Sequence, residues 1–147
     1  MVLAAAMSLV GCEGAPTTAP AMLPTCTMQI GTKTYELEMA RSSAEQEKGL
    51  MKRDSLPDNH GMIFIFDADR LQQFWMKDTR IPLDIIFCDH AGRVVSVATM
   101  QAYDLGNTSS IEPAQYAIEL NAGQAKAAGV ERGNTLTIPD VARYKAK

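Results

Sequence analysis

The fold of this chain is decided by one stretch, Phe74-Trp75-Met76-Lys77-Asp78-Thr79-Arg80-Ile81-Pro82-Leu83-Asp84-Ile85-Ile86-Phe87, in which four consecutive polar residues separate two apolar arms. The arms are rich in the aromatic and branched residues that are typical of strands. Asp78 and Pro82 are turn residues. The stretch therefore predicts a strand, a short loop and a second strand.

Asp84 occupies an unusual position in the second predicted strand. Strand alternation places Asp84 and Ile86 on one face, opposite the face shared by Leu83, Ile85 and Phe87. A carboxylate in such apolar company needs hydrogen bonds or a cation. The nearest candidates in the sequence are Lys77, Arg80 and the loop amides.

Two interpretations of the loop follow, and the sequence leaves both open. In the first, the loop is a structural clasp that fixes neighbouring strands. In the second, it is a ligand site in which Trp75 forms a platform and Lys77, Asp78 and Arg80 supply polar contacts, since pockets combine an apolar wall with a few polar groups.

Size and composition limit the possible classes of protein. The chain has 147 residues, of which 46% are hydrophobic and 21% charged, so it accommodates one globular domain and a tail. Its net charge is -3. A nucleic-acid partner is not expected, because such proteins usually carry a basic stripe.

The first twelve residues differ from the rest. The apolar segment 1–10 runs into Leu9-Val10-Gly11-Cys12, which resembles the lipobox of bacterial lipoproteins. The segment is too short to span a bilayer and predicts a signal peptide over residues 1–12, with lipidation of Cys12 and a membrane-anchored position in the periplasm or cell envelope. No Lys or Arg precedes the apolar run. The alternative is therefore a disordered N-terminus or a misassigned start.

Composition also predicts the domain boundaries. Residues 13–24 are rich in Pro, Ala and Thr and suit an extended tether. We expect a single globular domain over residues 25–140 and a frayed tail over residues 141–147. Within the domain, Cys26 and Cys88 could form a disulfide in an oxidising compartment, although two buried free thiols are the favoured state.

Periodicity predicts an α+β, β-rich fold, either a compact mixed sheet or a small barrel of about seven strands with two short helices. The expected strands are Thr25–Ile30, Thr34–Met39, Met62–Phe66, Leu71–Lys77, Ile85–Cys88 paired with Val94–Val97, Tyr116–Leu120 and Thr135–Ile138. One expected helix, Ser42–Met51, begins with a capping box formed by Ser42 and Glu45. The other, Ala122–Ala128, would be capped by Asn121 and stopped by Gly129.

Gly49 is costly inside a helix, so it either ends the first helix or allows another backbone to approach closely. We expect the close approach, with Leu50 and Met51 facing the core.

Five sequence blocks resemble a known family. They are Gly49-Leu50-Met51-Lys52-Arg53, Gly61-Met62-Ile63-Phe64, Phe74 to Ile85, Ser109-Ser110 and Glu119-Leu120-Asn121-Ala122-Gly123. In this order they are similar to the domain of unknown function number 192 family, also called uncharacterised protein family 0127. Asp78 replaces a common Asn, and Asn134 replaces an Asp that often follows Gly133. The resemblance, over residues 25–138, implies a small β-rich fold and frequent export, but no established activity.

No catalytic or metal-binding motif is evident. His60 and His90 are far apart in the sequence, and Cys88 with His90 forms only a weak pair of possible ligands. The chain has nine Met residues, a possible soft-metal signal. Met28, Met39, Met51, Met62 and Met76 occupy apolar positions, which favours a core role. We expect no metal and no cofactor.

The sequence thus predicts binding of a small ligand or an envelope partner protein. The candidate residues are Trp75, Lys77, Asp78, Thr79, Arg80, Asp84, Ser109, Ser110 and Glu119. A hydrolase or transferase that uses Asp84 or Glu119 as acid or base is the alternative, since desolvation raises carboxyl pKa values. Ion pairing of these two carboxylates with a cation is the simpler structural expectation, and Ser109 and Ser110 could be ordinary turn residues. A clasp without a ligand is the third possibility.

Overall fold

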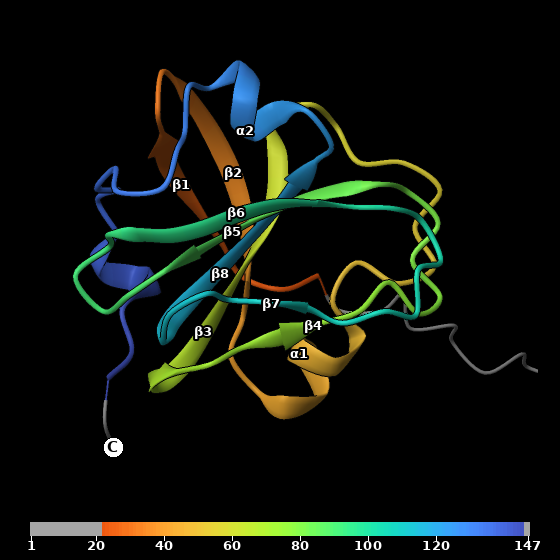
Figure 1. Cartoon of the computed structure of the whole chain (residues 1–147), viewed down its shortest axis with the longest axis horizontal. Coiled ribbons are helices and arrows are strands. Elements are labelled where there is room, and N and C mark those ends of the chain that lie inside the picture. Colours follow the sequence, from red (N-terminus) through yellow and green to blue (C-terminus); the bar gives the residue numbers. More distant parts are fainter. Residues whose placement is uncertain (1–21, 146–147) are drawn as a thin grey trace, which may run out of the picture.

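The computed structural model describes residues 22–145, which form a six-stranded sheet, a separate two-stranded sheet and short helices (Figure 1). The predicted signal peptide, Cys12 and most of the predicted tether lie outside these residues. The larger sheet has the order β1-β2-β3-β8-β5-β6. Its strands are β1 (Thr25–Ile30), β2 (Lys33–Ala40), β3 (His60–Arg70), β8 (Ala114–Asn121), β5 (Leu83–Cys88) and β6 (Val94–Met100).

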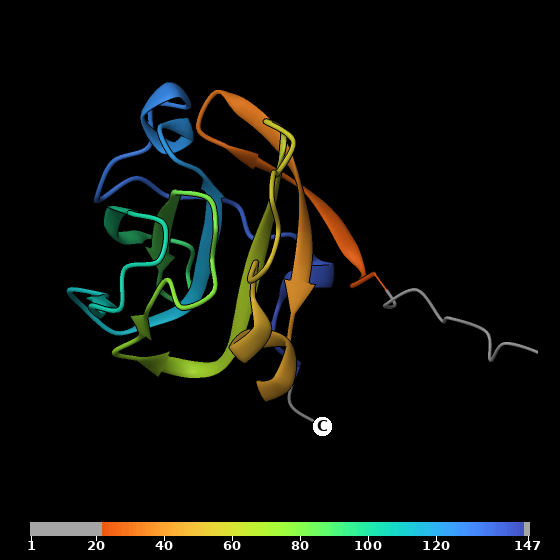
Figure 2. The ribbon, with the colours of Figure 1, turned by 90° about the vertical axis from the view of Figure 1, so that its right-hand side faces the viewer.

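The sheet is mixed and open. β2 and β3 pair in parallel, and the other neighbours pair antiparallel. Figure 2 shows that the sheet curls, with the β1–β2 hairpin on one side and β5 and β6 on the other. Among residues 22–145, β1 and β6 do not pair with each other, so no barrel closes. The mixed-sheet form of the predicted α+β fold is therefore confirmed.

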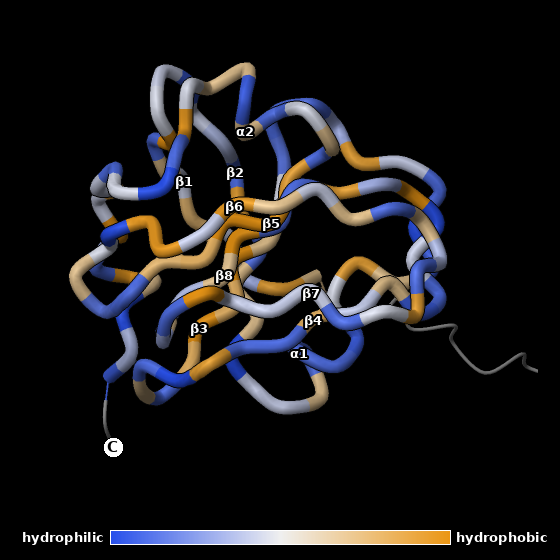
Figure 3. The backbone as a smooth tube through the Cα atoms, viewed as in Figure 1, coloured by the Kyte–Doolittle hydropathy of each residue, from blue (hydrophilic) through white to orange (hydrophobic). Residues whose placement is uncertain are grey.

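The two faces of the sheet belong to two apolar clusters. Ile63 and Ile118 belong to the first cluster, which the β1–β2 hairpin and the C-terminal segment cover. Met62 and Phe64 belong to the second, which includes Leu50 from the turn that follows α1 (Ser43–Lys48). Figure 3 shows apolar residues along the central strands and polar residues along α1. The central strands can therefore bury both faces.

Several predicted elements differ from the observed ones. The arm Leu71–Lys77 is a strand only at β4 (Gln73–Phe74), which pairs with β7 (Thr108–Ser109). β3 continues through the predicted turn 67–70, with an irregular register between Ile65 and Arg70. Segment Thr135–Ile138 is not a strand, because only Thr135 forms a bridge, to Arg93. These short segments depend on tertiary partners and not on their own pattern.

Helix α1 is stabilised by its N-terminal capping box and by a hydrogen bond to the sheet. Ser42 and Glu45 form the predicted capping box, and no residue within the helix is buried. Gln46 fastens α1 to the sheet, because its Nε2 donates to the Ile65 carbonyl oxygen at 2.9 Å, next to the irregular part of β3. Short helices are marginal alone, so these contacts hold α1 in place.

Gly49 ends α1, which corrects the expected backbone approach. Its φ of 45° and ψ of -134° lie in a region that favours glycine. The close neighbour is a side chain, since a Cβ at Gly49 would lie 3.3 Å from Phe64 Cζ. Leu50 is buried as expected, whereas Met51 is only half-buried.

Helix α2 (Gln124–Ala127) is shorter than predicted and is capped by Gly123, not by Asn121. The Asn121 side chain instead donates to the Leu56 carbonyl oxygen at 2.7 Å. Gly129 follows with a φ of 73°, the left-handed conformation expected of a C-terminal stop.

Cys26 and Cys88 are both free and buried, in agreement with the favoured expectation. Burial raises the pKa of the Cys88 thiol to about 12. It also raises the pKa of Cys26, an effect that the nearby Arg41 opposes. Neither thiol has the lowered pKa of a reactive cysteine.

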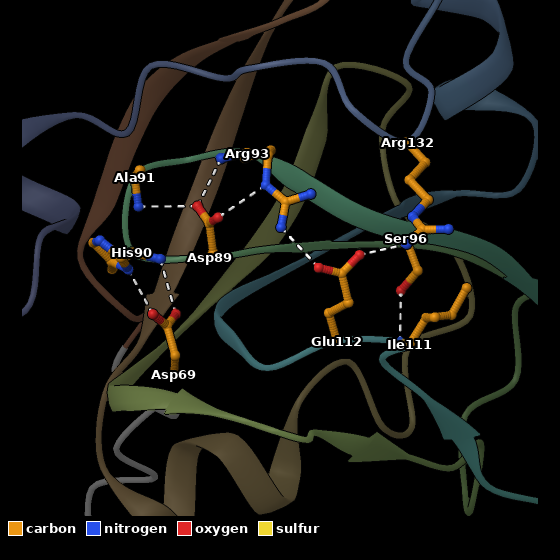
Figure 4. Close-up of polar contacts among 9 residues, drawn as sticks. All are labelled: Asp69, Asp89, His90, Ala91, Arg93, Ser96, Ile111, Glu112 and Arg132. Atoms are coloured by element: carbon orange, nitrogen blue, oxygen red, sulfur yellow. Dashed lines mark hydrogen bonds and ion pairs between the residues drawn. The ribbon is translucent and has the colours of Figure 1, made fainter.

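An ion-pair network connects the ends of several strands (Figure 4). His90, in the β5–β6 turn, binds Asp69 of β3 twice, through its backbone N and through Nδ1. Farther along, Glu112 pairs with both Arg93 and Arg132. The network links the β5–β6 turn to β3 and to the segments that flank β8 and α2.

Candidate functional site

A cavity of about 190 Å³ lies between α1 with its following turn and the sheet face formed by β3 and β8. We call it the Glu119 pocket. Its lining residues are Gln46, Glu47, Lys48, Gly49, Leu50, Met51, Phe64, Phe66, Gln72, Gln73, Phe74, Trp75, Thr79 and Glu119. Three separate parts of the fold therefore meet here: the α1 turn, the central strands and the start of the Trp75–Asp84 loop.

Glu119 is the buried ionisable group of the pocket. In β8 it lies opposite Met62 of β3 and Ile85 of β5, both apolar, and only 5% of it is exposed. Within residues 22–145 its carboxyl group makes no hydrogen bond and no ion pair, so the expected pairing with a cation is wrong. Burial without a partner raises its pKa to about 8. Such a carboxyl group can exchange a proton near neutral pH.

Aromatic rings form one wall of the pocket. The Phe64 and Phe74 rings meet edge to face with centroids 4.9 Å apart, and the Phe66 and Phe74 centroids are 6.4 Å apart. Trp75 lies at the mouth with 46% of its surface exposed. The Lys77 ammonium lies 5.2 Å from the centre of the indole ring. This provides an apolar wall beside a single buried acid.

The loop from Trp75 to Asp84 is fixed by backbone contacts. Met76 is buried, and its N donates to the Asp104 carbonyl oxygen at 2.8 Å. Asp78 has a φ of 55°, a conformation that Asn and Asp tolerate better than most residues. The Lys52 N donates to the Asp78 carbonyl oxygen, which connects the loop to the turn after α1.

Only some of the predicted site residues line the same cavity. Trp75, Thr79 and Glu119 line the Glu119 pocket. Lys77 and Asp78 line an adjoining groove that shares Trp75 with the pocket. The loop therefore contributes one end to the pocket and its polar tip to the neighbouring surface.

The remaining predicted residues have other partners. Arg80 is paired with Asp54 at 2.6 Å on the surface. Ser110 Oγ accepts from the Gln72 N at 2.9 Å, while Ser109 is exposed in β7. Neither serine lines the pocket.

Asp84 is satisfied without a cation. The Thr99 hydroxyl donates to Oδ1 at 2.6 Å, and the Ala125 N donates to Oδ2 at 2.9 Å. Asp84 shares its face with Ile86, as predicted, and so points away from the Glu119 pocket. The proposed partners Lys77 and Arg80 are wrong, and Asp84 instead connects β6 to α2.

Sequence reasoning missed the polar residues of α1 and the phenylalanine wall. Phe64 and Phe66 alternate on one side of β3, and Glu119 interrupts an apolar alternation in β8. This shared spacing signals that the residues occupy corresponding faces of two strands. The contributions of Gln46 and Gln72 have no local signal, because they depend on how α1 and β4 pack.

Possible metal ligands do not form a cluster in the described part of the chain. Residues 22–145 contain no group of three or more His, Cys, Asp or Glu side chains that could hold a metal ion. Met28, Met39, Met62 and Met76 are buried in the apolar clusters, as expected for core residues. The same residues contain no helix with the length and apolarity that a membrane span requires.

Comparisons with known proteins agree with this fold. A family model described as DUF192, "Uncharacterized ACR", matches residues 26–138. A crystal structure from Sinorhizobium meliloti, provisionally named a transcription regulator, is 31% identical over 81% of this chain and 97% of its own, with a TM-score of 0.75. A protein of unknown function from Novosphingobium aromaticivorans is 34% identical over 86% and 94%, with a TM-score of 0.71. No curated protein matches the chain.

Proposed function

The chain belongs to the DUF192 family, whose description names no activity, and we propose that it binds a small ligand in the Glu119 pocket. The observation that carries the proposal is the Glu119 side chain at a cavity wall: the residue is only 5% exposed, and its carboxyl group makes no hydrogen bond or ion pair within residues 22–145. Burying such a group without a partner costs free energy. A ligand that pairs with Glu119 offsets that cost and supplies a reason for its position.

The origin of the lining residues supports the same proposal. Gly49, Phe64, Trp75 and Glu119 come from four of the five sequence blocks that resemble the family. These blocks are distant in the chain and meet around one cavity. A structural clasp would require the Trp75–Asp84 loop to pack, but it would not require an unpaired acid beside a cavity.

Acid–base catalysis by Glu119 is a second candidate, because its pKa of about 8 suits proton transfer near neutral pH. Asp84 does not share this role, since both of its oxygens accept hydrogen bonds on the other face of the sheet. A hydrolase and transferase activity screen with wild type and Glu119→Gln tests the candidate. Turnover that survives in Glu119→Gln would exclude Glu119 as the acid or base.

The proposal includes an envelope location with a lipid on Cys12. The lipobox-like sequence supports it, and Met22 and Leu23 line a groove beside α1, so a tether would reach the domain near the pocket. Metabolic labelling with radioactive palmitate tests the anchor. We expect label in the wild type and none in Cys12→Ser; an unlabelled, unprocessed wild type would contradict it.

Ligand binding is tested by ligand-observed NMR with a library of small fragments. Wild type, Glu119→Gln and Trp75→Ala should differ in the fragments that they bind. Ser109→Ala is the matched control, because Ser109 is exposed and outside the pocket. Identical binding by all four proteins would reject the Glu119 pocket as the site.

A further inference from the structure

The charges around the Glu119 pocket are unevenly distributed. Glu119 is buried, whereas Glu47 and Lys48, the other charged lining residues, are exposed on α1 at the mouth. No cation in residues 22–145 pairs with Glu119. An anionic ligand would bring a second negative charge to this wall whenever Glu119 is ionised, while a cation would neutralise it.

The buried and half-buried polar side chains of the pocket each direct at least one hydrogen-bond donor to a backbone carbonyl oxygen. Thr79 is buried, and its hydroxyl donates to the Lys77 carbonyl oxygen at 3.2 Å. The Gln46 Nε2 donates to the Ile65 carbonyl oxygen at 2.9 Å, and the Gln72 Nε2 donates to the Ala114 carbonyl oxygen at 3.0 Å. These side chains retain oxygen acceptors. A ligand that brings donors can therefore pair with these acceptors and with Glu119.

The wall and the volume restrict the ligand further. Phe64, Phe66 and Phe74 form an apolar surface, and aromatic rings attract cations. The cavity of about 190 Å³ is large enough to hold several water molecules. A short alkyl chain fits this space.

From these observations we infer that the Glu119 pocket binds a small primary ammonium ion, which pairs with Glu119 and lays its carbon chain against the phenylalanine wall. The inference rests on the proposed function and names its ligand class. A free amine and a lysine side chain of a partner share this chemistry. Binding requires ionised Glu119, so a proton leaves the carboxyl group as the cation enters.

The test uses n-butylammonium and n-butanol, which have nearly the same shape but differ in charge. Isothermal titration and indole fluorescence of Trp75 report binding in the wild type, in Glu119→Gln and in the Ser109→Ala control. We expect the wild type to prefer butylammonium at least tenfold at pH 8, and Glu119→Gln to lose that preference. Melting temperatures verify that each variant folds.

A pH series on the wild type gives an independent readout. Butylammonium, like a lysine side chain, stays charged up to about pH 10. Its affinity should rise roughly tenfold from pH 6 to 7, rise less from 7 to 8 and then level off, as Glu119 loses its proton. Because Glu47 and Lys48 remain in Glu119→Gln, a flat profile there assigns the effect to Glu119.

The outcomes separate the two proposals. Butanol that binds as tightly as butylammonium, with binding reduced in Trp75→Ala, would overturn the ammonium inference and retain a small-ligand site. If neither probe binds and no fragment distinguishes wild type from Glu119→Gln, both proposals fail. If butylammonium binds as expected, Nα-acetyl-lysine methylamide distinguishes the sources: affinity equal to that of butylammonium supports a lysine side chain, and weaker affinity supports a free amine.

Discussion

Glu119 lies in the middle of β8, between apolar neighbours on β3 and β5, and its carboxyl group has no partner in the described range 22–145. Such a group adds little to stability near neutral pH, because burial desolvates the charged form and no cation within residues 22–145 compensates it. Its presence is therefore a cost to the ligand-free fold. That cost can be measured as a function of pH.

Glu119→Gln should stabilise the ligand-free protein. The folded pKa of about 8 lies above the value of about 4.3 for an unperturbed Glu. Between these values the folded state binds one more proton than the unfolded state, so stability falls as pH rises. At pH 7 the gain in the free energy of unfolding should be about 3 kcal/mol, with almost none at pH 4.

Urea denaturation of both proteins from pH 4 to 9 measures this difference. All other titrating groups are shared, so the difference curve isolates Glu119. It should widen from pH 4.5 to 8 and then remain constant. Parallel curves for the two proteins would show that Glu119 does not titrate with a raised pKa.

Glu119 and Asp84 show which properties of a single buried carboxylate can be predicted from the sequence. Alternation correctly predicts that each carboxylate lies in an apolar strand, because the side-chain period of a strand is fixed. Their partners are not predictable in the same way. Asp84 obtains its hydrogen bonds from Thr99 and Ala125, which are brought near by tertiary packing, and Glu119 obtains none from the part of the chain that the structure describes.

At the scale of elements, Asp84 joins β5 to its neighbours. It accepts from the Thr99 side chain of β6 and from the Ala125 backbone N of α2, a helix of only four residues. Asp84→Ala leaves the buried Ala125 N–H without its acceptor, which should cost about 1–3 kcal/mol. Thr99→Val removes one bond and should cost less. Butylammonium binding should be unchanged in both, which titration calorimetry can check.

The turn after α1 is the element that shapes the pocket, and Gly49 is its critical residue. Gly49→Ala places a Cβ 3.3 Å from Phe64 Cζ and forces alanine into a backbone region that favours glycine. We expect a loss of about 1–3 kcal/mol in thermal or urea unfolding. Gly129→Ala is the matched control, because Gly129 also has a positive φ but has open space around its Cβ position.

The control separates backbone strain from crowding at Phe64. A Gly49→Ala cost no larger than that of Gly129→Ala would contradict a contribution from crowding at Phe64. From the sequence, Gly49 could be recognised as an exceptional residue, but the reason why glycine is required there could not. Its neighbour Phe64 is on a strand fifteen positions later, and local propensity carries no information about that contact.

At the scale of the whole molecule, the alternating strands and the β5–β6 hairpin were predictable, since their signals are local. The parallel pairing of β2 with β3 and the insertion of β8 between β3 and β5 were not, because they join distant segments. The short strands β4 and β7 have too few residues to show a period. The Glu119 pocket was not predictable from local sequence either, since it exists only when four distant segments are assembled.

The His90–Asp69 contact is a tertiary contact at the edge of the fold, and it can be tested by mutation. It joins the β5–β6 turn to the far end of β3, across a distance in sequence of 21 residues. The hydrogen bond to Asp69 is the main cause of a raised pKa for His90, with a further contribution from Asp89, whose carboxylate also binds Arg93. The exposed position of His90 limits the effect on stability to a small one.

The direction in which this contribution to stability changes with pH is nevertheless defined. Because the folded pKa of His90 is raised, the stabilisation is fully present below the unfolded pKa of about 6.5 and is lost as pH rises through the higher folded value. His90→Ala should therefore lower the melting temperature at pH 6 and leave it nearly unchanged at pH 9. Adding Asp69→Asn should abolish the pH 6 effect of His90→Ala, and 1 M salt should weaken it. A melting-temperature difference that is the same at pH 6 and pH 9 would mean that the imidazolium–carboxylate pair does not connect the turn to β3.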